Sequence, residues 1–237
     1  MWQRLAYSLF KVLALGVFLL VRRLQPWQST KLPKRQRTAL GLAAFIGGML
    51  GAKAGFMMAN LGSWSFDFVW LADGKTVLTG IACAYVAVEL TKLAIGIRVK
   101  TGDDYALPLA LALAVGRWGC FCNGCCFGTP TTVPWAVVFH DGLPRHPTQI
   151  YESLFHFTMA MVLFVLARKN KLPTHRLQFY LIAFCVFRFF TEYIRPEPPW
   201  FLGWTFYQWT AVAMALGLAG QWAWDERRRR PELLFPV

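Results

Sequence analysis

Apolar runs of membrane-spanning length alternate with short polar joints along almost the whole chain. A helix needs about 17 to 25 mostly apolar residues to cross a bilayer, and the hydropathy pattern predicts seven such helices. They are expected at Leu5–Val21, Ala39–Leu61, Val77–Ile97, Tyr105–Cys120, Thr148–Ala167, Leu177–Ile194 and Gly203–Trp224. The predicted fold class is therefore all-α: a polytopic integral membrane protein with seven transmembrane helices.

Basic residues gather in alternate joints and in the C-terminal tail. The Lys- and Arg-rich segments contain Arg22, Arg23, Lys31, Lys34, Arg35, Arg37, Arg98, Lys100, Arg168, Lys169, Lys171, Arg176 and Arg227–Arg230. The other joints are poorer, with Lys75, Arg145 and Arg195. Because cytoplasmic loops carry an excess of Lys and Arg, we expect the N-terminus outside and the C-terminus in the cytoplasm.

Composition excludes two broad classes. Of 237 residues, 56% are hydrophobic, which argues against a soluble globule. The formal net charge is +13, but the basic residues lie in joints and do not form a stripe interleaved with aromatics that could stack bases. We therefore expect no nucleic acid partner and no cofactor, and favour an anionic lipid surface as the partner of the positive charge.

The chain shows no internal repeat and no long polar insert, so residues 1–237 are expected to form a single transmembrane domain. Its longest extramembrane piece is an external loop at about 121–147, rich in Gly, Pro and Thr and predicted to be irregular. Irregular backbone at membrane depth must be buried in protein or line a wet cavity. A loop that leaves one helix near Arg117 and enters the next near Thr148 would roof such a cavity on the external side.

The first chemical motif is GRWGCFCNGCCFG, residues 116–128. An arginine at membrane depth costs about 2.5 to 3.5 kcal/mol on insertion scales, so Arg117 marks a functional site by default. Its guanidinium suits a phosphate or carboxylate, and glycines such as Gly128 let backbone approach a ligand closely. The alternative is that Arg117 snorkels to the interface while the glycines pack helices.

The second motif is RHPTQIYES, Arg145–Ser153. Gln149, Glu152 and His156 share one helix face by their spacing. Glu152 near a helix start can also be explained by the positive end of the helix dipole.

Two histidines are candidates for a general base, His146 and His140, because an unperturbed imidazole titrates near a pH of about 6.5. The alternative for either is an ordinary solvated loop histidine.

The third motif is FRFFTEYIRPEPP, in which Arg188, Glu192 and Arg195 fall at i, i+4 and i+7. We expect an ion-paired polar wall that faces the bundle interior. Pairing of Glu192 with an arginine could be purely structural, and an arginine left over would be available for an anionic headgroup. Glu89 and Lys92 are expected to form an ion pair with each other.

Four cysteines, Cys120, Cys122, Cys125 and Cys126, lie close together. A soft metal site or a C-x-x-C redox pair would use such residues, but no second C-x-x-C or His pair completes a tetrahedral zinc site, and no metal is expected. On an oxidising face a structural disulfide is the default expectation. A reactive thiolate beside Arg117 is the alternative.

Together these motifs resemble the prolipoprotein diacylglyceryl transferase family, whose pattern runs roughly GRxGNFxNxExxG, then RHPSQLYE, then FRxxxExxRxP. The stretch GGMLGAKAGF is also similar to that family's GxxxGxRxGY, with Lys53 for the arginine. The resemblance covers most of the chain from Gly47 to Gln208.

The resemblance implies a multi-pass enzyme of the bacterial inner membrane whose active site faces the periplasmic or external side. Such enzymes move the diacylglyceryl group of phosphatidylglycerol, or a related anionic phospholipid, onto the lipobox cysteine of an exported lipoprotein precursor, releasing glycerol phosphate. Arg117 and Arg188 would hold the leaving phosphate, ordered by Asn123 and Glu192. The substrate-binding positions that it implies are Asn123, Gly128, Arg145, Gln149, Tyr151, Glu152, Glu192, Arg195 and Lys53.

Three positions depart from the family pattern. Cys120 replaces an asparagine, Cys125 replaces a carboxylate, and Leu78 stands where the family has a histidine. The proton acceptor for the substrate thiol is then His146, His140 or a cysteine thiolate such as Cys125. The open alternatives are a divergent transferase that uses another acceptor through a cysteine intermediate, and a non-catalytic lipid-binding protein.

Overall fold

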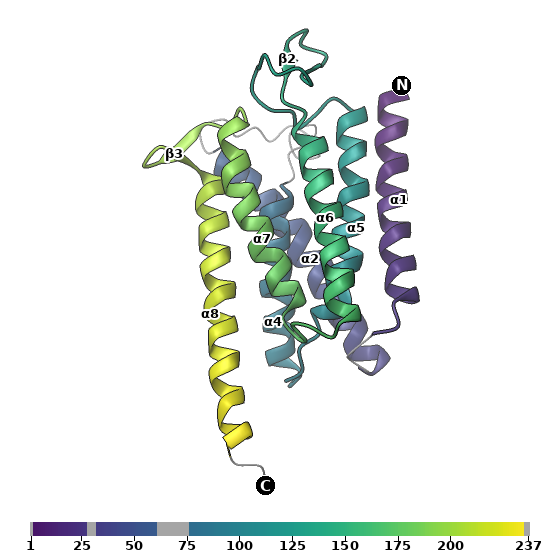
Figure 1. Cartoon of the computed structure of the whole chain (residues 1–237), viewed down its shortest axis with the longest axis vertical. Helices are drawn as coiled ribbons and strands as arrows, with labels where there is room; N and C mark the ends of the chain where they lie inside the picture. The colour runs from purple at the N-terminus through teal and green to yellow at the C-terminus, as the bar shows by residue number, and fades with distance from the viewer. Residues whose placement is uncertain (1, 28–31, 61–75, 235–237) are drawn as a thin grey trace. The chain divides into compact units, whose positions relative to one another are not determined.

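A computed structural model describes residues 2–27, 32–60 and 76–234, with side chains to residue 228. The expected positions Lys31, Leu61 and Lys75, and the side chains of Arg229 and Arg230, lie outside the described residues. The helices are α1 (Trp2–Leu24), α2 (Lys34–Ala59), α4 (Val77–Ala94), α5 (Asp103–Cys122), α6 (Thr148–Arg168), α7 (Arg176–Thr191), the 3-10 turn η1 (Glu192–Ile194) and α8 (Phe206–Leu234) (Figure 1). Short antiparallel pairs join β1 (Val137–Val138) to β2 (Pro144–Arg145) and β3 (Pro199–Phe201) to β4 (Trp204–Thr205).

In the described parts of the chain, six helical segments are long and apolar enough to cross a membrane: Trp2–Leu24, Lys34–Ala59, Val77–Ala94, Asp103–Cys122, Thr148–Arg168 and Arg176–Ile194. They coincide with the first six predicted spans, so the all-α membrane fold is confirmed. The seventh prediction, Gly203–Trp224, overlaps α8, which extends to Leu234 and is not among the six. Seven crossings therefore stay a prediction.

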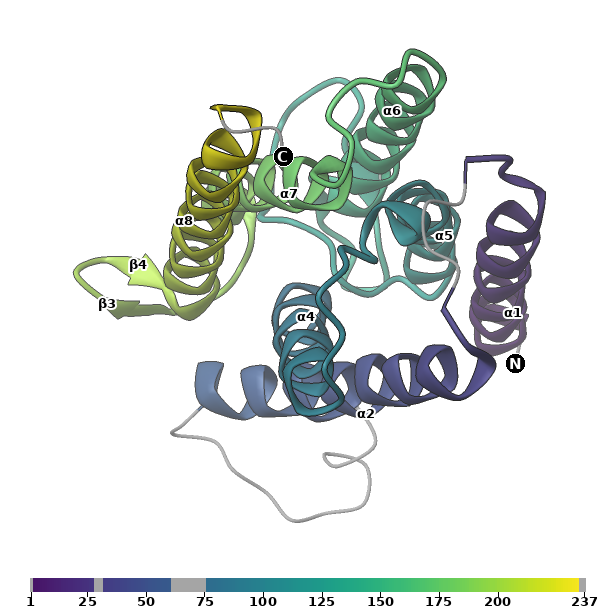
Figure 2. The same cartoon turned by 90° about the horizontal axis from the view of Figure 1, so that it is seen from below.

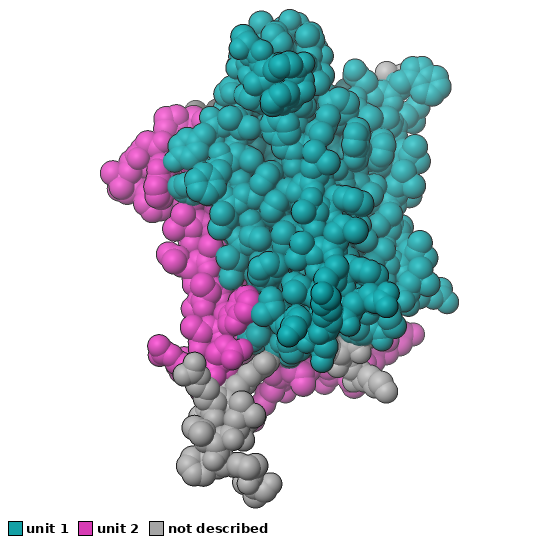
Figure 3. All heavy atoms as spheres, viewed as in Figure 1, with its two compact units in different colours: residues 1–30, 100–196 teal, residues 31–99, 197–237 magenta. Residues whose placement is uncertain are grey.

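The chain divides into two compact units, coloured separately in Figure 3. The first contains Met1–Thr30 and Lys100–Pro196, and the second contains Lys31–Val99 and Glu197–Val237. Within the first unit, α5 packs between α1 and α6, and α7 contacts both α5 and α6 (Figure 2). The single domain of residues 1–237 stays a prediction.

The second unit is built on close contact between α2 and α4. Gly47, Gly51 and Gly55 recur every four residues on the face of α2 that meets α4. A Cβ on Gly51 would stand 2.5 Å from the Sγ of Cys83, so only glycine fits there. This is the small-residue packing that lets membrane helices approach closely, since hydrocarbon offers no hydrophobic drive to bring them together.

The predicted pairing of Glu89 with Lys92 on α4 is confirmed, with 3.0 Å between Oε1 and Nζ.

The loop between α5 and α6 departs from the prediction of irregular backbone in one place. β1 and β2 form a short hairpin, with Val137 opposite Arg145. Asp141 and Gly142 stand in the connection, and Gly142 has a φ of +74°. Asp-Gly is a strong local hairpin signal because the glycine adopts positive φ without strain. The prediction of irregular backbone is therefore wrong for the segment that this turn closes.

Candidate functional site

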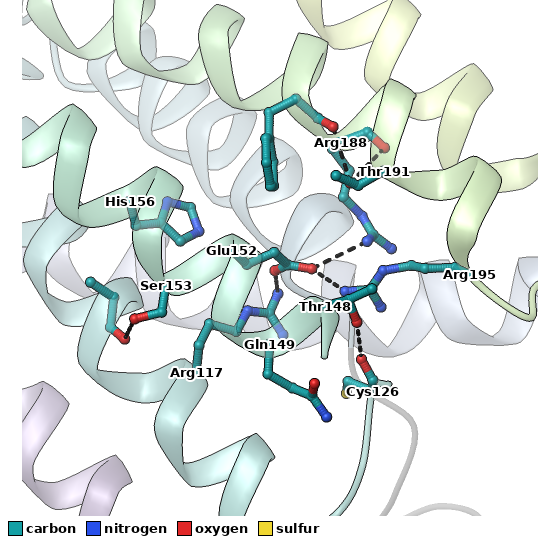
Figure 4. A network of polar contacts seen from close by, with 12 residues as sticks. Arg117, Cys126, Thr148, Gln149, Glu152, Ser153, His156, Arg188, Thr191 and Arg195 are labelled. Carbon is teal, nitrogen blue, oxygen red and sulfur yellow. Dashed lines mark hydrogen bonds and ion pairs between the residues drawn. The ribbon is translucent and has the colours of Figure 1, made fainter. Parts of the chain in front are cut away.

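Glu152 lies at the centre of the polar network in Figure 4. Its fully buried carboxylate is contacted by Arg117 from α5, Arg188 from α7 and Arg195 from beyond η1. The Arg188 Nη1 atom is 3.3 Å from Glu152 Oε1, and the Arg188 Nη2 atom is 2.8 Å from Glu192 Oε2. We call these five residues the Glu152 cluster. The structure thus brings together Arg117 and Arg188, the two predicted phosphate-binding arginines, which lie on separate helices.

The Glu152 cluster carries an excess of positive charge. Three guanidinium groups face two carboxylates, and the arginine side chains are at most 10% exposed. Burying an unbalanced charge is costly, so an additional anion would stabilise the cluster.

The position of Arg195 corrects the prediction of one continuous helical face. α7 ends at Thr191, and Arg195 has an extended backbone with φ −107° and ψ 147°. The residue before a proline is pushed out of the helical region, and Pro196 follows. Arg195 therefore lies past the helix, and its guanidinium binds Glu152, whereas Glu192 pairs with Arg188 as anticipated.

Several polar atoms of this region are buried without a hydrogen-bond partner among the described residues. They are Arg117 Nε, Arg195 Nε, Gln149 Oε1 and His156 Nε2. The large majority of buried polar side-chain atoms in proteins are paired, so unpaired ones call for an explanation. Two donors on arginines of the Glu152 cluster are consistent with a site for an anionic, hydrogen-bond-accepting ligand.

The start of α6 holds the loop that follows α5. The Thr148 hydroxyl donates to the carbonyl of Cys126 at 2.6 Å, and Gln149 Nε2 donates to the carbonyl of Cys125 at 2.7 Å. Gly124 and Cys126 both have positive φ, +64° and +65°. A cysteine in this conformation is uncommon and is retained where the surroundings enforce it. Thr148 was not among the predicted site residues, although a hydroxyl directly after His-Pro at a helix start is a visible signal.

His156 shares the face of Glu152 as predicted, but it points to a partner that the sequence did not identify. Its Nδ1 lies 2.9 Å from the hydroxyl of Tyr180 on α7, and both side chains are fully buried. Ser153 donates to the carbonyl of Ala114 at 2.8 Å, tying α6 to α5. These contacts fix the helices on which Arg117 and Arg188 stand.

All six cysteines are free thiols, so the disulfide expected on the external face is wrong for this structure. The sulfur atoms of Cys120, Cys125 and Cys126 all lie within 4.8 Å of one another, and we call these three the thiol cluster. Cys122 does not belong to it. The Cys125 thiol also donates to the Cys120 carbonyl at 3.6 Å.

The surroundings of Cys126 favour its thiolate. The sulfur atoms of Cys120 and Cys125 lie within 4.8 Å of its own, and Arg117 and Arg195 are close, so the pKa of Cys126 lies well below its usual value. This agrees with the alternative of a thiolate beside Arg117.

Asn123 was expected to order an arginine, and Arg145 was expected to bind the lipid headgroup. The structure gives both residues other contacts. Asn123 caps the C-terminal end of α5, and its side chain lies near the thiol of Cys125. Arg145 Nε donates to Asp141 Oδ2 at 2.5 Å, and its Nη1 donates to the carbonyl of Gly128 at 3.1 Å. The structure thus ties Arg145 to the hairpin loop.

Close contacts beside the hairpin loop involve Gly128, His146 and Tyr151. A Cβ on Gly128 would stand 2.6 Å from the Ile194 carbonyl oxygen and 2.7 Å from His146 Cβ. His146 Nδ1 lies 3.3 Å from the Tyr151 hydroxyl, which accepts a hydrogen bond from Trp135 Nε1 at 2.7 Å. Tyr151 is therefore joined to His146 and the loop.

Lys53 and Leu78 both belong to the second unit. Lys53 Nζ lies 5.1 Å from the centre of the Phe56 ring. Leu78 is 2% exposed, as expected of an apolar side chain at the start of α4.

A hollow of about 740 Å³ lies among α1, α5 and α6, and its lining includes Trp27, Leu107, Phe164 and Arg168. Arg168 is about 24 Å along α6 from Glu152, at 1.5 Å per residue, so this hollow is remote from the Glu152 cluster. The chamber expected on the external side stays a prediction.

The fold and site define a multi-pass α-helical membrane protein with a buried, positively charged cluster suited to an anionic group. Comparison with known proteins makes the assignment specific: the chain matches the prolipoprotein diacylglyceryl transferase family over residues 3–224 and belongs to that family. The family and the apolar helices indicate a multi-pass protein of the bacterial inner membrane.

The relatives are named phosphatidylglycerol–prolipoprotein diacylglyceryl transferases. The protein of Bordetella bronchiseptica is 31% identical over 87% of this chain and 84% of its own length. That of Bordetella avium is 30% identical over 89% and 86%, and that of Polaromonas sp. is 38% identical over 53% and 49%. The resemblance read from the motifs is therefore confirmed.

Proposed function

We propose that this protein transfers the diacylglyceryl group of phosphatidylglycerol to the cysteine thiol of an exported prolipoprotein, releasing glycerol phosphate. The observation that carries the proposal is the Glu152 cluster, in which three arginines from separate segments surround one buried carboxylate. A phosphate diester would supply the anion that balances the excess charge. Membership of the family and the names of its relatives supply the reaction.

Arg117 and Arg188 are assigned to the phosphate that leaves. Negative charge grows on this group as the bond to the diacylglyceryl carbon breaks, and fixed donors aimed at it lower the barrier. Glu152 and Glu192 hold the guanidinium groups in place before the lipid binds, so little reorganisation is needed. The Arg117 Nε atom is buried without a hydrogen-bond partner among the described residues, so it can donate to the lipid.

The remaining polar residues are assigned to the surroundings of the headgroup. Arg195 and Gln149 complete its polar wall, and each has a buried polar atom without a partner among the described residues. Gly128, Arg145 and Tyr151 shape the loop above it through the contacts already given. We include Asn123 and Lys53 as substrate-binding residues on the family resemblance.

The acceptor thiol must lose its proton before it attacks the lipid. We assign this step to His146, because an imidazole nitrogen can accept a proton and the His146 Nδ1 atom lies 3.3 Å from the Tyr151 hydroxyl, which orients the ring. Leu78, at the position of the family's histidine, cannot accept a proton, so another residue has to take that role.

A second candidate function is favoured by the thiol cluster, which replaces an asparagine and a carboxylate of the family pattern. In this alternative a cysteine of the thiol cluster, either the predicted Cys125 or the more readily ionised Cys126, takes the diacylglyceryl group first and passes it to a different acceptor. The site keeps the same phosphate-binding arginines.

The test is mass spectrometry after incubation of the full chain with phosphatidylglycerol vesicles and a lipobox peptide. A diacylglyceryl mass gain on the peptide supports the first function, and one on Cys125 or Cys126 of the protein supports the second. A gain on neither contradicts both and leaves a lipid-binding protein. Arg168→Ala is the matched control for the arginine variants, because Arg168 is an exposed arginine at the far end of α6.

The variants Arg117→Ala and Arg188→Ala are expected to lower the rate of peptide modification by about 10²- to 10³-fold, the loss typical of removing one transition-state donor. Arg168→Ala should retain the full rate. An arginine variant that remains as active as Arg168→Ala would refute the phosphate role.

We also propose that the chain crosses the membrane seven times, with α8 as the last crossing, the N-terminus outside and the site facing the periplasm. The distribution of Lys and Arg among the joints supports this orientation.

A further inference from the structure

The thiol cluster has a geometry that transferase chemistry does not require. Cys120 is in the last turn of α5, and Cys125 and Cys126 follow after a tight turn at Gly124. The turn reverses the chain, so that three sulfur atoms from the seven-residue stretch 120–126 lie within 4.8 Å of one another. Cys122, two residues from Cys120, does not point to the same place.

These sulfur separations are close to those around a bound soft metal ion. With a metal–sulfur bond of about 2.3 Å, three thiolates in a trigonal arrangement stand about 4 Å apart. Movements of less than about 1 Å would bring the three sulfur atoms to one ion. Gln149 and Thr148 hold the carbonyls of Cys125 and Cys126, respectively. The loop is therefore already fixed close to the conformation in which the three sulfur atoms would bind one ion.

The charges nearby favour an anionic group of thiolates. Arg117 lies near Cys120 and Cys126, and Arg195 lies near Cys126. These arginines belong to the Glu152 cluster, which has one more positive than negative group. A thiolate-bound cation with net negative charge would therefore lie beside compensating guanidinium groups.

We propose that Cys120, Cys125 and Cys126 form a three-thiolate binding site for a soft, thiophilic cation of the Cu(I) type. Thiolates select soft ions, and a structural zinc site usually needs four ligands, whereas the described residues bring three together here. The ion enters without a change of oxidation state, and each thiol that ligates it releases its proton to water. The expectation from sequence spacing that no metal binds assumed a four-ligand site.

The site lies beside the residues assigned to the transfer reaction, but its test does not depend on turnover. The full-length protein is purified in detergent, reduced and freed of metal, and Cu(I) is titrated in competition with a chromophoric Cu(I) chelator. We expect one tightly bound Cu(I) per chain. Sulfur X-ray absorption of the complex should then report thiolate coordination by three sulfur atoms.

Serine variants provide the comparison. Cys120→Ser, Cys125→Ser and Cys126→Ser should each weaken Cu(I) binding by at least about tenfold, because a hard hydroxyl replaces a soft thiolate. Cys122→Ser is the matched control and should bind as the wild type does. Thermal unfolding of each metal-free variant separates lost ligation from lost folding. Cys126→Ser is the decisive variant if the others fail to fold, since Cys126 is exposed.

Three results would overturn the proposal: no stoichiometric Cu(I) binding by the reduced protein, equal loss of affinity in Cys122→Ser and Cys126→Ser, or full affinity in folded Cys126→Ser. A protein that binds Cu(I) but does not modify the peptide contradicts the proposed function alone. One that modifies the peptide without binding Cu(I) contradicts this inference alone.

Discussion

At the scale of single residues, Glu152 determines how the site is built. It neutralises charge on Arg117, Arg188 and Arg195 at once and is fully buried. The sequence identified all four residues as polar groups in apolar surroundings. It could not identify Glu152 as their common partner, because the contact joins α5, α6 and the segment after α7, and such convergence depends on tertiary packing.

Glu152→Gln should destabilise the folded protein strongly. The substitution keeps the shape of the side chain but removes the negative charge that three buried guanidinium groups share. Removing one partner of a buried ion pair costs about 3–5 kcal/mol in the free energy of unfolding. Thermal unfolding in detergent measures the loss.

Asp141→Asn is the control for this prediction. Asp141 pairs with Arg145 in the hairpin loop. Burial acts to raise the pKa of Asp141, but the hydrogen bond from Arg145 outweighs it, so the pKa lies below its usual value. Pairs near the surface contribute little, so Asp141→Asn should leave the melting temperature almost unchanged. Equal stability of the two variants would contradict the role given to Glu152.

At the scale of elements, hydropathy predicted the first six helices within a few residues at most ends. It erred where local chemistry overrides periodicity. Pro196 excludes Arg195 from the helix, and the turn at Asp141 and Gly142 closes a hairpin in a loop expected to be irregular. The thiol cluster was also beyond reach, since C-x4-C-C spacing does not reveal which sulfur atoms a tight turn brings together.

Gly51→Ala should separate α2 from α4. The added Cβ would meet Cys83 and the carbonyl of Thr79, 2.8 Å away, and overpacking of this kind costs about 1–3 kcal/mol. Gly41→Ala on the same helix is the control, because no atom lies within 4 Å of its Cβ. We expect a lower melting temperature for Gly51→Ala and an equal or higher one for Gly41→Ala. The reverse order would show that α2 and α4 do not pack through this glycine face.

At the scale of the whole molecule, the orientation in the membrane decides which substrates the site can meet. The proposed function requires the loop between α5 and α6 to face the outer side, because an exported lipoprotein precursor presents its cysteine there. The sequence predicts this from the joints rich in Lys and Arg. The number of crossings is harder to read because α8 carries glutamines within its apolar stretch.

Reporter fusions test the topology. A reporter that is active only outside the cytoplasm should be active when inserted at Gly142 and inactive when fused after Val237. With six crossings, Gly142 and Val237 would lie on the same side, and both fusions would give the same result. That outcome would remove α8 as a crossing.

The central claim is that Arg117 and Arg188 converge on the phosphate of a bound anionic lipid. The most direct measurement is the rate at which the lipobox peptide gains a diacylglyceryl group from phosphatidylglycerol vesicles, compared between Arg188→Ala and Arg168→Ala. The account predicts a loss of about 10²-fold or more for Arg188→Ala and none for Arg168→Ala. Equal rates in the two variants, with both folded, would contradict it.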